Sequence, residues 1–274
     1  MEAAMDLMRR MPPCESEKAL QSLVQLLPHL SQDLLSRVDQ PLQVATDEET
    51  QKDFLLCDYN RDGDSHRSPW SSLYYPPLED GTQPSKDLRQ MEIEANAVFA
   101  IYRDQYYEGG ISSVYMWEPE EGDGFAACFL IKKDGSEGAD GRRGLLQHGV
   151  WDAIHVIEVG EVDENGQAHY CLTSTVMLAL RSENKVSGTF SMSGSITRQM
   201  EDTLDVTDGH ITNMGRMIEE MESKLRNGLD QVYFGKTKEV VSTLREPLGM
   251  MSASSFTGQS IQSNIINDML RRGM

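Results

Sequence analysis

The sequence has 274 residues, enough for one large domain or two with a proper hydrophobic core, and its 44 acidic and 25 basic side chains give a net charge of −19. This charge argues against nucleic acid as a partner and against non-specific binding to anionic membranes, because both require a cationic surface. The four cysteines form no CxxC pair, no run approaches about 18 apolar residues, and no apolar signal sequence opens the chain. We therefore expect no zinc site, no cofactor, no membrane span and a cytosolic protein with free thiols.

Short helices are predicted in the first 45 residues, over 2–11, 15–27 and 31–38. Prolines interrupt the segment between these helices and after the last of them. The second helix has one apolar face, formed by Leu20, Leu23, Val24 and Leu27. Because each helix is too short to be stable alone, we expect residues 1–45 to form a small antiparallel helical stalk.

Residues 46–84 are rich in turn-forming residues, most densely at 57–70, which read CDYNRDGDSHRSPW. Counting from Asp58, oxygen ligands fall at positions typical of the first half of an EF-hand calcium loop. The second half fails, because Pro69 stands where a bidentate glutamate is required. We therefore favour successive Asp and Asn turns, with Trp70 anchoring this loop to a core and no metal bound.

A helix is predicted over 85–107, capped by Ser85 at its start and ended by Gly109 and Gly110 in a left-handed cap. Its residues at helical spacing predict a buried stripe made of Leu88, Met91, Ala95, Val98, Tyr102 and Tyr106, with Phe99 beside it.

Strands are predicted over 111–118, 124–133, 149–160, 167–181 and 186–199, and the short Gly-rich connections favour an antiparallel meander. Apolar runs surround Cys128 and Cys171, which we expect to be buried thiols. The Gly-rich segment 134–148 is expected to be a mobile loop. Irregular alternation after Trp151 suggests a bulge.

Two histidines, His155 and His169, fall on neighbouring predicted strands and could approach each other. Two strand histidines without a third ligand more often pack than bind a metal. The sequence also offers no G-x-S-x-G elbow, no HExxH motif and no P-loop. We therefore do not expect an enzyme.

A long helix is predicted over 209–245, with an apolar row formed by Ile211, Met214, Ile218, Met221, Leu225, Gly228 and Val232. At about 1.5 Å per residue it would span roughly 50 Å, so it would cover the sheet and reach a second chain. An open sheet edge beside such a helix also favours dimerisation. A self-pairing coiled coil is the alternative, which Gly215, Gly228 and the polar Asn227 weaken.

The C-terminal tail begins after Pro247 with a small, polar linker over 249–260. A short amphipathic helix is predicted after the linker, with an apolar face made of Ile261, Ile265, Ile266, Met269 and Leu270. Such a helix is marginal in water and could become ordered in a hydrophobic groove of a partner. A frayed, non-functional terminus is the alternative.

These elements predict an α+β protein. Its parts are a helical stalk (1–45), a turn-rich connecting region (46–84), a helix plus an antiparallel sheet (85–200), a long helix across that sheet (201–247) and a flexible tail (248–274).

Several motifs, in order along the chain, resemble the F-actin capping protein beta subunit family, also called the CapZ beta family. They are VDQPL at 38–42, CDYNRD at 57–62, RSPW at 67–70, PPLED at 76–80, EGGISSVY at 108–115, LTSTVM at 172–177 and YFGKTK at 233–238. The resemblance runs from about residue 3 to about residue 247, while the tail diverges from the family's usual one. Its signature residues, with an expected structural role, are Cys57, Asp58, Tyr59, Asn60, Arg61 and Asp62.

The resemblance implies an obligate heterodimer with an alpha subunit of the same fold, whose strands continue the sheet of this chain. It implies a non-enzymatic function in the cytoplasm and cytoskeleton, in which the heterodimer caps the barbed end of an actin filament and blocks subunit addition and loss. It also implies regulators, namely CARMIL-type capping-protein-interacting motifs, myotrophin-like inhibitors and phosphoinositides. A heterodimeric scaffold subunit in an actin-related assembly, without capping activity, is the alternative.

Two actin-binding elements follow from the resemblance. The first is the basic end of the long helix, with Lys224, Arg226, Lys236 and Lys238. Because actin is acidic, these side chains could steer association, although a solvated helix face is the simpler interpretation of the charges alone. The second element is the amphipathic tail helix, whose role is carried over as a hypothesis without matching individual residues.

Overall fold

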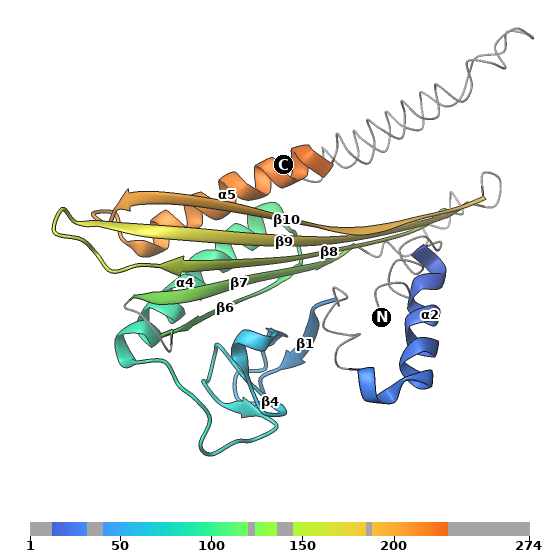
Figure 1. The fold of residues 1–274 in the computed structure, drawn as a ribbon, viewed down its shortest axis with the longest axis horizontal. Coiled ribbons are helices and arrows are strands. Elements are labelled where there is room, and N and C mark those ends of the chain that lie inside the picture. Colours follow the sequence, from blue (N-terminus) through green and yellow to red (C-terminus); the bar gives the residue numbers. More distant parts are fainter. Residues whose placement is uncertain (1–12, 32–40, 120–123, 136–144, 185–187, 230–274) are drawn as a thin grey trace, which may run out of the picture.

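The computed structural model describes residues 13–31, 41–119, 124–135, 145–184 and 188–229 (Figure 1). Its elements are α2 (Pro13–Leu26), η1 (Pro28–Leu30), β1 (Gln43–Thr46), β2 (Asp53–Leu56), η2 (Asp58–Asn60), β3 (Arg61–Asp62), β4 (Ser65–Arg67), β5 (Tyr74–Tyr75), α4 (Lys86–Tyr106), β6 (Ile111–Trp117), β7 (Phe125–Asp134), β8 (Leu145–Val159), β9 (Gln167–Asn184), β10 (Gly188–Asp205) and α5 (His210–Leu229). Among these helices, none has the length and apolarity needed to cross a membrane.

The N-terminal helix α2 confirms the helix predicted over 15–27. Four residues form its half-buried face, while the residues between them are exposed: Leu20, Leu23, Val24 and Leu27. Residues 2–11 and 32–38 of the two other predicted helices lie outside the described residues. β1 begins at Gln43, so the strands of the connecting region start slightly before the predicted boundary.

The centre of the fold is a five-stranded sheet in the order β10-β9-β8-β7-β6, with every neighbouring pair antiparallel. This confirms the predicted meander. The bulge predicted after Trp151 is wrong, because β8 pairs in one unbroken register with both β7 and β9. Its alternation looks irregular because both faces of β8 are covered: Ile157 packs on the helix side and Ile154 on the opposite side. β8 also begins at Leu145, so 145–148 of the predicted loop belong to this strand, and 136–144 lie outside the described residues.

Helices α4 and α5 cover one face of the sheet and enclose the main core with it (Figure 1). α4 begins as predicted, with the Ser85 hydroxyl accepting from the Leu88 N–H at 3.4 Å. Its predicted stripe is largely confirmed, with the exception of Val98, whose side chain is 54% exposed. The inner face of α4 instead includes two polar residues, Glu92 and Asn96, which are buried.

The connecting module, which we define as residues 41–84, covers part of the opposite face of the sheet. A second, smaller core lies between them, made of Leu42, Leu55, Tyr115, Cys128 and Leu130. The Leu42 N–H donates to Oδ2 of Asp152 on β8 at 2.9 Å, and the Tyr115 hydroxyl of β6 donates to the Leu55 carbonyl at 2.7 Å. Sheet side chains therefore hold the backbone of the module directly.

The dense turn segment at 57–70 folds on its own polar side chains, as the turn interpretation predicts. The Asn60 amide oxygen accepts from the Cys57 N–H at 3.0 Å, and its nitrogen donates to the Arg67 carbonyl at 2.9 Å. The anchoring role predicted for Trp70 needs correction. The side chain is half-buried rather than in a core, and its indole N–H donates to the Asp53 carbonyl at 3.1 Å.

A buried ion pair joins the module to α4. Arg67 of β4 meets Glu92 of α4 in a two-pronged contact, with nitrogen–oxygen distances of 2.8 and 2.7 Å. Arg89 contacts the same carboxylate from the preceding turn of the helix. Both Arg67 and Glu92 are almost completely buried, so each depends on the other for charge compensation.

The two edges of the sheet differ. On β6, Asn96 accepts from the Val114 N–H at 2.9 Å and donates to the Val114 carbonyl at 2.8 Å, while Glu92 accepts from the Met116 N–H at 2.7 Å. Side chains of α4 thus satisfy outward-facing backbone groups of this edge. β10 pairs with β9 alone among the described strands. From residue 193 to 205 it is exposed, apart from three half-buried side chains facing the core: Ile196, Met200 and Leu204.

Asp47, in the turn between β1 and β2, is a buried carboxylate with unusual hydrogen bonding. Its oxygens accept from the hydroxyls of Ser68 at 2.5 Å and Ser71 at 2.6 Å, and from the backbone N–H groups of Glu49 and Thr50, each at 2.9 Å. Burial alone would raise the pKa of Asp47, but these hydrogen bonds outweigh it and hold the pKa well below its usual range.

This carboxylate predicts an acid-sensitive contribution to stability. Because the folded pKa of Asp47 is depressed, its contribution is complete above the unfolded value of about 3.9 and is lost as the pH falls towards the folded value. In urea unfolding between about pH 6 and pH 3, Asp47→Asn should flatten the acid limb of the stability curve. The exposed Asp80→Asn is the matched control. Parallel curves for Asp47→Asn and the unchanged protein would contradict the assignment.

Candidate functional site on the C-terminal half of α5

The predicted apolar row places α5 on the sheet. Met214, Ile218, Met221 and Leu225 are buried against the core, while Gly215 and Glu219 face outwards. The prediction for the first half of the helix is therefore confirmed. Residues beyond Leu229, including Val232, lie outside the described residues.

A carboxylate, Glu222, interrupts this apolar row on the buried face. It receives hydrogen bonds from the hydroxyls of two α4-end tyrosines, Tyr107 and Tyr102, the latter at 2.7 Å. Nε2 of His155 on β8 lies 3.1 Å from Oε1, and the Arg226 guanidinium lies 3.2 Å from Oε2. We call these five residues the Glu222 cluster. It ties α5 to both α4 and the sheet.

The cluster is arranged to keep Glu222 ionised. Burial by itself would raise the pKa of Glu222, but the contacts with His155 and Tyr107 and the nearby Arg226 charge outweigh it and lower that pKa. Burial and the Glu222 charge raise the pKa of Tyr102 and of Tyr107, so both remain hydroxyl donors. A buried negative charge is therefore matched by donors and one cation.

Arg226, the predicted actin-contacting residue, is partly inside this cluster. Its guanidinium lies 4.9 Å from the ring centroid of Tyr107 and 5.7 Å from that of Trp151. The side chain is only 32% exposed. Arg226 therefore has a structural role in seating α5, and one part of it reaches the surface.

Of the four basic residues predicted to bind actin, the structure describes Lys224 and Arg226, and Lys224 is the more accessible of these two. Its side chain is 59% exposed and pairs with Glu220 one turn earlier at 2.7 Å. Its ammonium also lies 3.8 Å from the Met200 sulfur of β10, so this surface continues from the helix towards the open strand. Lys236, Lys238 and the tail residues, which are Ile261, Ile265, Ile266, Met269 and Leu270, lie outside the described residues.

The two strand histidines, for which the sequence left an approach open, do not meet. In the register of β8 and β9, His155 lies opposite Ser174, and its Nδ1 is 2.9 Å from the Ser174 hydroxyl. His169 lies opposite Thr203 of β10 on the other face of the sheet, with its Nδ1 3.3 Å from the hydroxyl. Pairing register, which the spacing alone did not determine, separates them.

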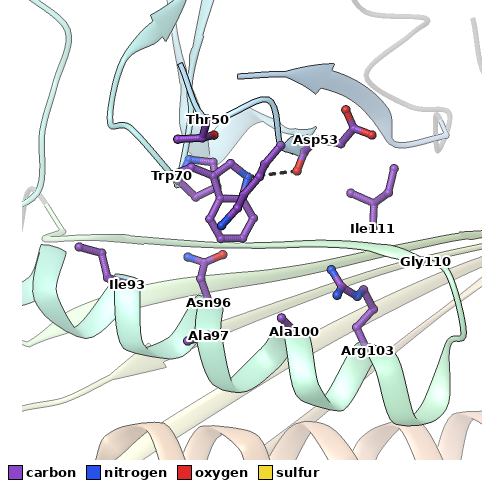
Figure 2. Close-up of a pocket in the computed structure, with 12 residues that line it drawn as sticks. Thr50, Asp53, Trp70, Ile93, Asn96, Ala97, Ala100, Arg103, Gly110 and Ile111 are labelled. Atoms are coloured by element: carbon purple, nitrogen blue, oxygen red, sulfur yellow. Dashed lines mark hydrogen bonds between the residues drawn. The ribbon is translucent and has the colours of Figure 1, made fainter. Parts of the chain in front are cut away.

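A groove lies elsewhere, between α4 and the connecting module (Figure 2). It has a volume of about 680 Å³ and is lined by Thr50, Lys52, Asp53, Pro69, Trp70, Ile93, Asn96, Ala97, Ala100, Arg103, Gly110 and Ile111. Its charged side chains already have partners: the Lys52 ammonium lies 4.9 Å from the Trp70 ring centroid, Asp53 accepts from the Thr46 hydroxyl, and Arg103 pairs with Asp104. The groove therefore does not gather free reactive groups.

A family model described as "F-actin capping protein, beta subunit" matches residues 1–241. The chain belongs to this family. Relatives named F-actin-capping protein subunit beta include one from Arabidopsis thaliana, 65% identical over 247 residues that cover 90% of this chain and 96% of the relative. Another, from Drosophila melanogaster, is 53% identical over 271 residues, or 98% and 93% of the two chains. The resemblance predicted from the motifs is thus confirmed.

The fold is also found in a solved structure, described as the homodimeric actin capping protein alpha subunit from Plasmodium berghei. The match has a TM-score of 0.55 and covers 92% of this chain and 98% of the other, at 15% sequence identity. It shows a shared architecture between a capping protein beta chain and an alpha chain. An alpha subunit of the same fold was implied by the motif resemblance.

The signature residues of the capping protein beta family lie in the connecting module, away from α5. Asn60 is buried, and the Tyr59 ring stacks on Trp117 with centroids 4.8 Å apart. Arg61 donates to the Gly63 carbonyl at 2.7 Å, and Asp62 accepts from the Thr82 N–H at 3.0 Å. Cys57 and Asp58 are at the start of η2. These contacts favour the predicted structural role.

The sequence reasoning missed the Glu222 cluster and the Arg67–Glu92 pair. One signal was available: Glu222 follows Met221 on the apolar face of its helix, and Glu92 follows Met91 on the apolar face of α4. A charged residue on a buried helix face requires a partner. The identity of the partners, His155 and Arg67, depends on tertiary packing and has no local signature.

Proposed function

We propose that this chain is the beta subunit of a heterodimeric actin capping protein of the cytoplasm and cytoskeleton. The heterodimer binds the barbed end of a filament and blocks subunit addition and loss without catalysing a reaction. The observation that carries the proposal is the family match over residues 1–241, together with relatives named F-actin-capping protein subunit beta at up to 65% identity. The fold shared with a capping protein alpha subunit supports a partner of the same architecture.

The open strand β10 is the proposed site of the alpha subunit. It is long and largely exposed, and among the described strands it pairs on one side only. The opposite edge, β6, is occupied by Asn96 and Glu92. A partner strand added antiparallel to β10 would satisfy its backbone groups and continue the sheet.

The proposed actin-binding surface begins at Lys224 and continues along the basic end of the long helix, through Lys236 and Lys238, to the amphipathic tail. Arg226 contributes the exposed part of its side chain to this surface. Its contact with Glu222 in the Glu222 cluster holds that side chain in place. The tail residues Ile261 and Leu270, with the apolar residues between them, would supply a hydrophobic contact in the helix-in-groove mode. The family's regulators would act on the same heterodimer.

Actin elongation tests the function. The chain would be produced together with its candidate alpha subunit and titrated into pyrene-actin that grows at barbed ends from filament seeds. We expect inhibition at nanomolar heterodimer and none with this chain alone. A well-folded heterodimer that leaves elongation unchanged would overturn the capping proposal and favour a scaffold subunit without barbed-end binding.

Reversing the charge of Lys224 should weaken capping without loss of stability. In Lys224→Glu, the exposed ammonium is replaced by a carboxylate that repels an acidic filament surface, so association should slow roughly tenfold at low salt and less at high salt. Glu220→Lys on the preceding turn is the matched control, because it changes charge in the opposite direction. Equal rates for both variants would argue against steering by this surface.

Removing the tail separates capping from assembly. Deletion of residues 261–274 should raise the dissociation rate from barbed ends, because the hydrophobic contact is lost, and should leave the heterodimer intact by gel filtration. A matched variant with Ile265→Ser and Met269→Ser keeps the length of the tail and should have a smaller effect in the same direction. Unchanged capping by the deletion would refute an actin-binding role for the tail.

A further inference from the structure

Two cysteines from distant parts of the chain meet between the connecting module and the sheet. Cys57 ends the β2 region of the module, and Cys128 lies in the middle of β7 on the face that the module covers. Cys128 is part of the small core there, and Cys57 packs against that core. Both are free thiols.

Their environments differ in a way that gives each thiol a separate role. Cys57 is only half-buried, and its sulfur accepts the backbone N–H of Asn60 at the start of η2. Hydrogen bonds from Cys128 and from the Tyr59 and Asn60 backbone outweigh burial and lower the pKa of Cys57. Cys128 is completely buried, and burial raises its pKa well above the usual value. Cys57 is therefore the more accessible and more acidic thiol, and Cys128 is its protected neighbour.

We propose that Cys57 and Cys128 form a reversible disulfide when the protein meets a peroxide, with Cys57 oxidised first and Cys128 closing the bond. In the first step the Cys57 thiolate attacks one peroxide oxygen, the O–O bond breaks, and Cys57 sulfenic acid and hydroxide form. In the second step the Cys128 sulfur attacks the Cys57 sulfur, the S–O bond breaks, and water leaves with the Cys128 proton. A dithiol reductant returns both thiols.

The bond would join the connecting module covalently to the centre of the sheet. In the reduced protein, hydrogen bonds such as Leu42 to Asp152 and Tyr115 to Leu55 hold these two parts together. A cross-link between segments far apart in the sequence restricts the unfolded chain, so the oxidised protein should resist unfolding more than the reduced one. The site does not depend on actin binding, and it can be tested separately.

Cys171 provides an internal comparison. It is also half-buried, but it lies on β9, and its thiol donates towards Glu201 at 3.8 Å. Burial and the charges of Glu201 and Glu158 raise the pKa of Cys171. Cys171 is about as exposed as Cys57 but has a less acidic thiol. We therefore expect Cys171 to react with peroxide about tenfold more slowly than Cys57.

The experiment treats the full-length chain, in complex with its partner subunit and carrying Cys14→Ser, with stoichiometric hydrogen peroxide, followed by alkylation and peptide mass spectrometry. We expect a Cys57–Cys128 cross-linked peptide that has lost two hydrogen atoms and that disappears with dithiothreitol. Cys128→Ala should stop the reaction at Cys57 sulfenic acid, which dimedone traps, and Cys171→Ser should change nothing.

The cross-linked peptide is measured with Cys57 and Cys128 both native, so this result does not depend on whether Cys128→Ala folds. Cys57 found oxidised alone, as sulfenic or sulfinic acid, with no link to Cys128, would overturn the proposal. Loss of the Cys171 thiol as fast as that of Cys57 would overturn the assigned reactivity. A cross-link that forms only in urea would show that the native arrangement does not support the bond.

Discussion

Replacing Glu222 with alanine is expected to lower the free energy of unfolding by about 3–5 kcal/mol. The substitution removes the acceptor for two tyrosine hydroxyls, leaves the His155 ring without its Glu222 contact, and leaves the Arg226 guanidinium without its buried counter-charge. Unpaired polar groups and a cation in a buried site carry the full desolvation cost. The measurement is urea unfolding of the chain in its complex with the partner subunit, at a fixed protein concentration, followed by circular dichroism.

Glu220→Ala is the matched control for this prediction, because it removes a carboxylate from the same helix at an exposed ion pair with Lys224. Its effect should stay within about 1 kcal/mol. Glu222→Gln should fall between the two, since it keeps the shape but loses the charge. Equal destabilisation by Glu220→Ala and Glu222→Ala would show that the Glu222 cluster does not secure α5.

The second large effect is expected at the junction between the connecting module and α4. Arg67→Met keeps an unbranched apolar side chain but, among the described residues, leaves the buried Glu92 carboxylate with Arg89 as its remaining cationic partner. We expect a loss of about 3 kcal/mol in the free energy of unfolding, because an uncompensated buried charge costs more than the pair contributes.

Arg61→Met in the neighbouring strand is the appropriate comparison. Arg61 is half-exposed, and its ion pairs with Asp58 and Asp64 both measure 3.9 Å. Its replacement should cost at most about 1 kcal/mol. If Arg67→Met proved as mild as Arg61→Met, the two-pronged contact with Glu92 would not be what holds the module against the helix.

Much of the fold could be predicted from periodicity. The five strands, the meander and the apolar row of α5 follow from side-chain alternation and helical spacing, which depend on local geometry. The prediction of a bulge in β8 went wrong because that strand is covered on both faces, so its side chains no longer alternate between core and solvent. Val98 was misplaced because Glu92 and Asn96 turn the inner face of α4 towards the β6 edge.

The candidate site was harder to predict. The basic residues of α5 were visible in the sequence, but the partial burial of Arg226 was not, since it depends on Tyr107 and Trp151, which lie on other elements. The pairing of His155 with Ser174 and Glu222 likewise depends on strand register and on where α5 crosses the sheet. Local sequence patterns determine neither the strand register nor the place where α5 crosses the sheet.

The contrast between the two sheet edges limits how many chains can assemble. A sheet with both edges free could add a neighbour on each side and grow into an open-ended ribbon. Here Asn96 and Glu92 occupy backbone groups of β6 that such a neighbour would need. If the partner is sealed in the same way, pairing along β10 stops at two chains. Two polar side chains of one helix would thus set the stoichiometry of the complex and protect it from aggregation.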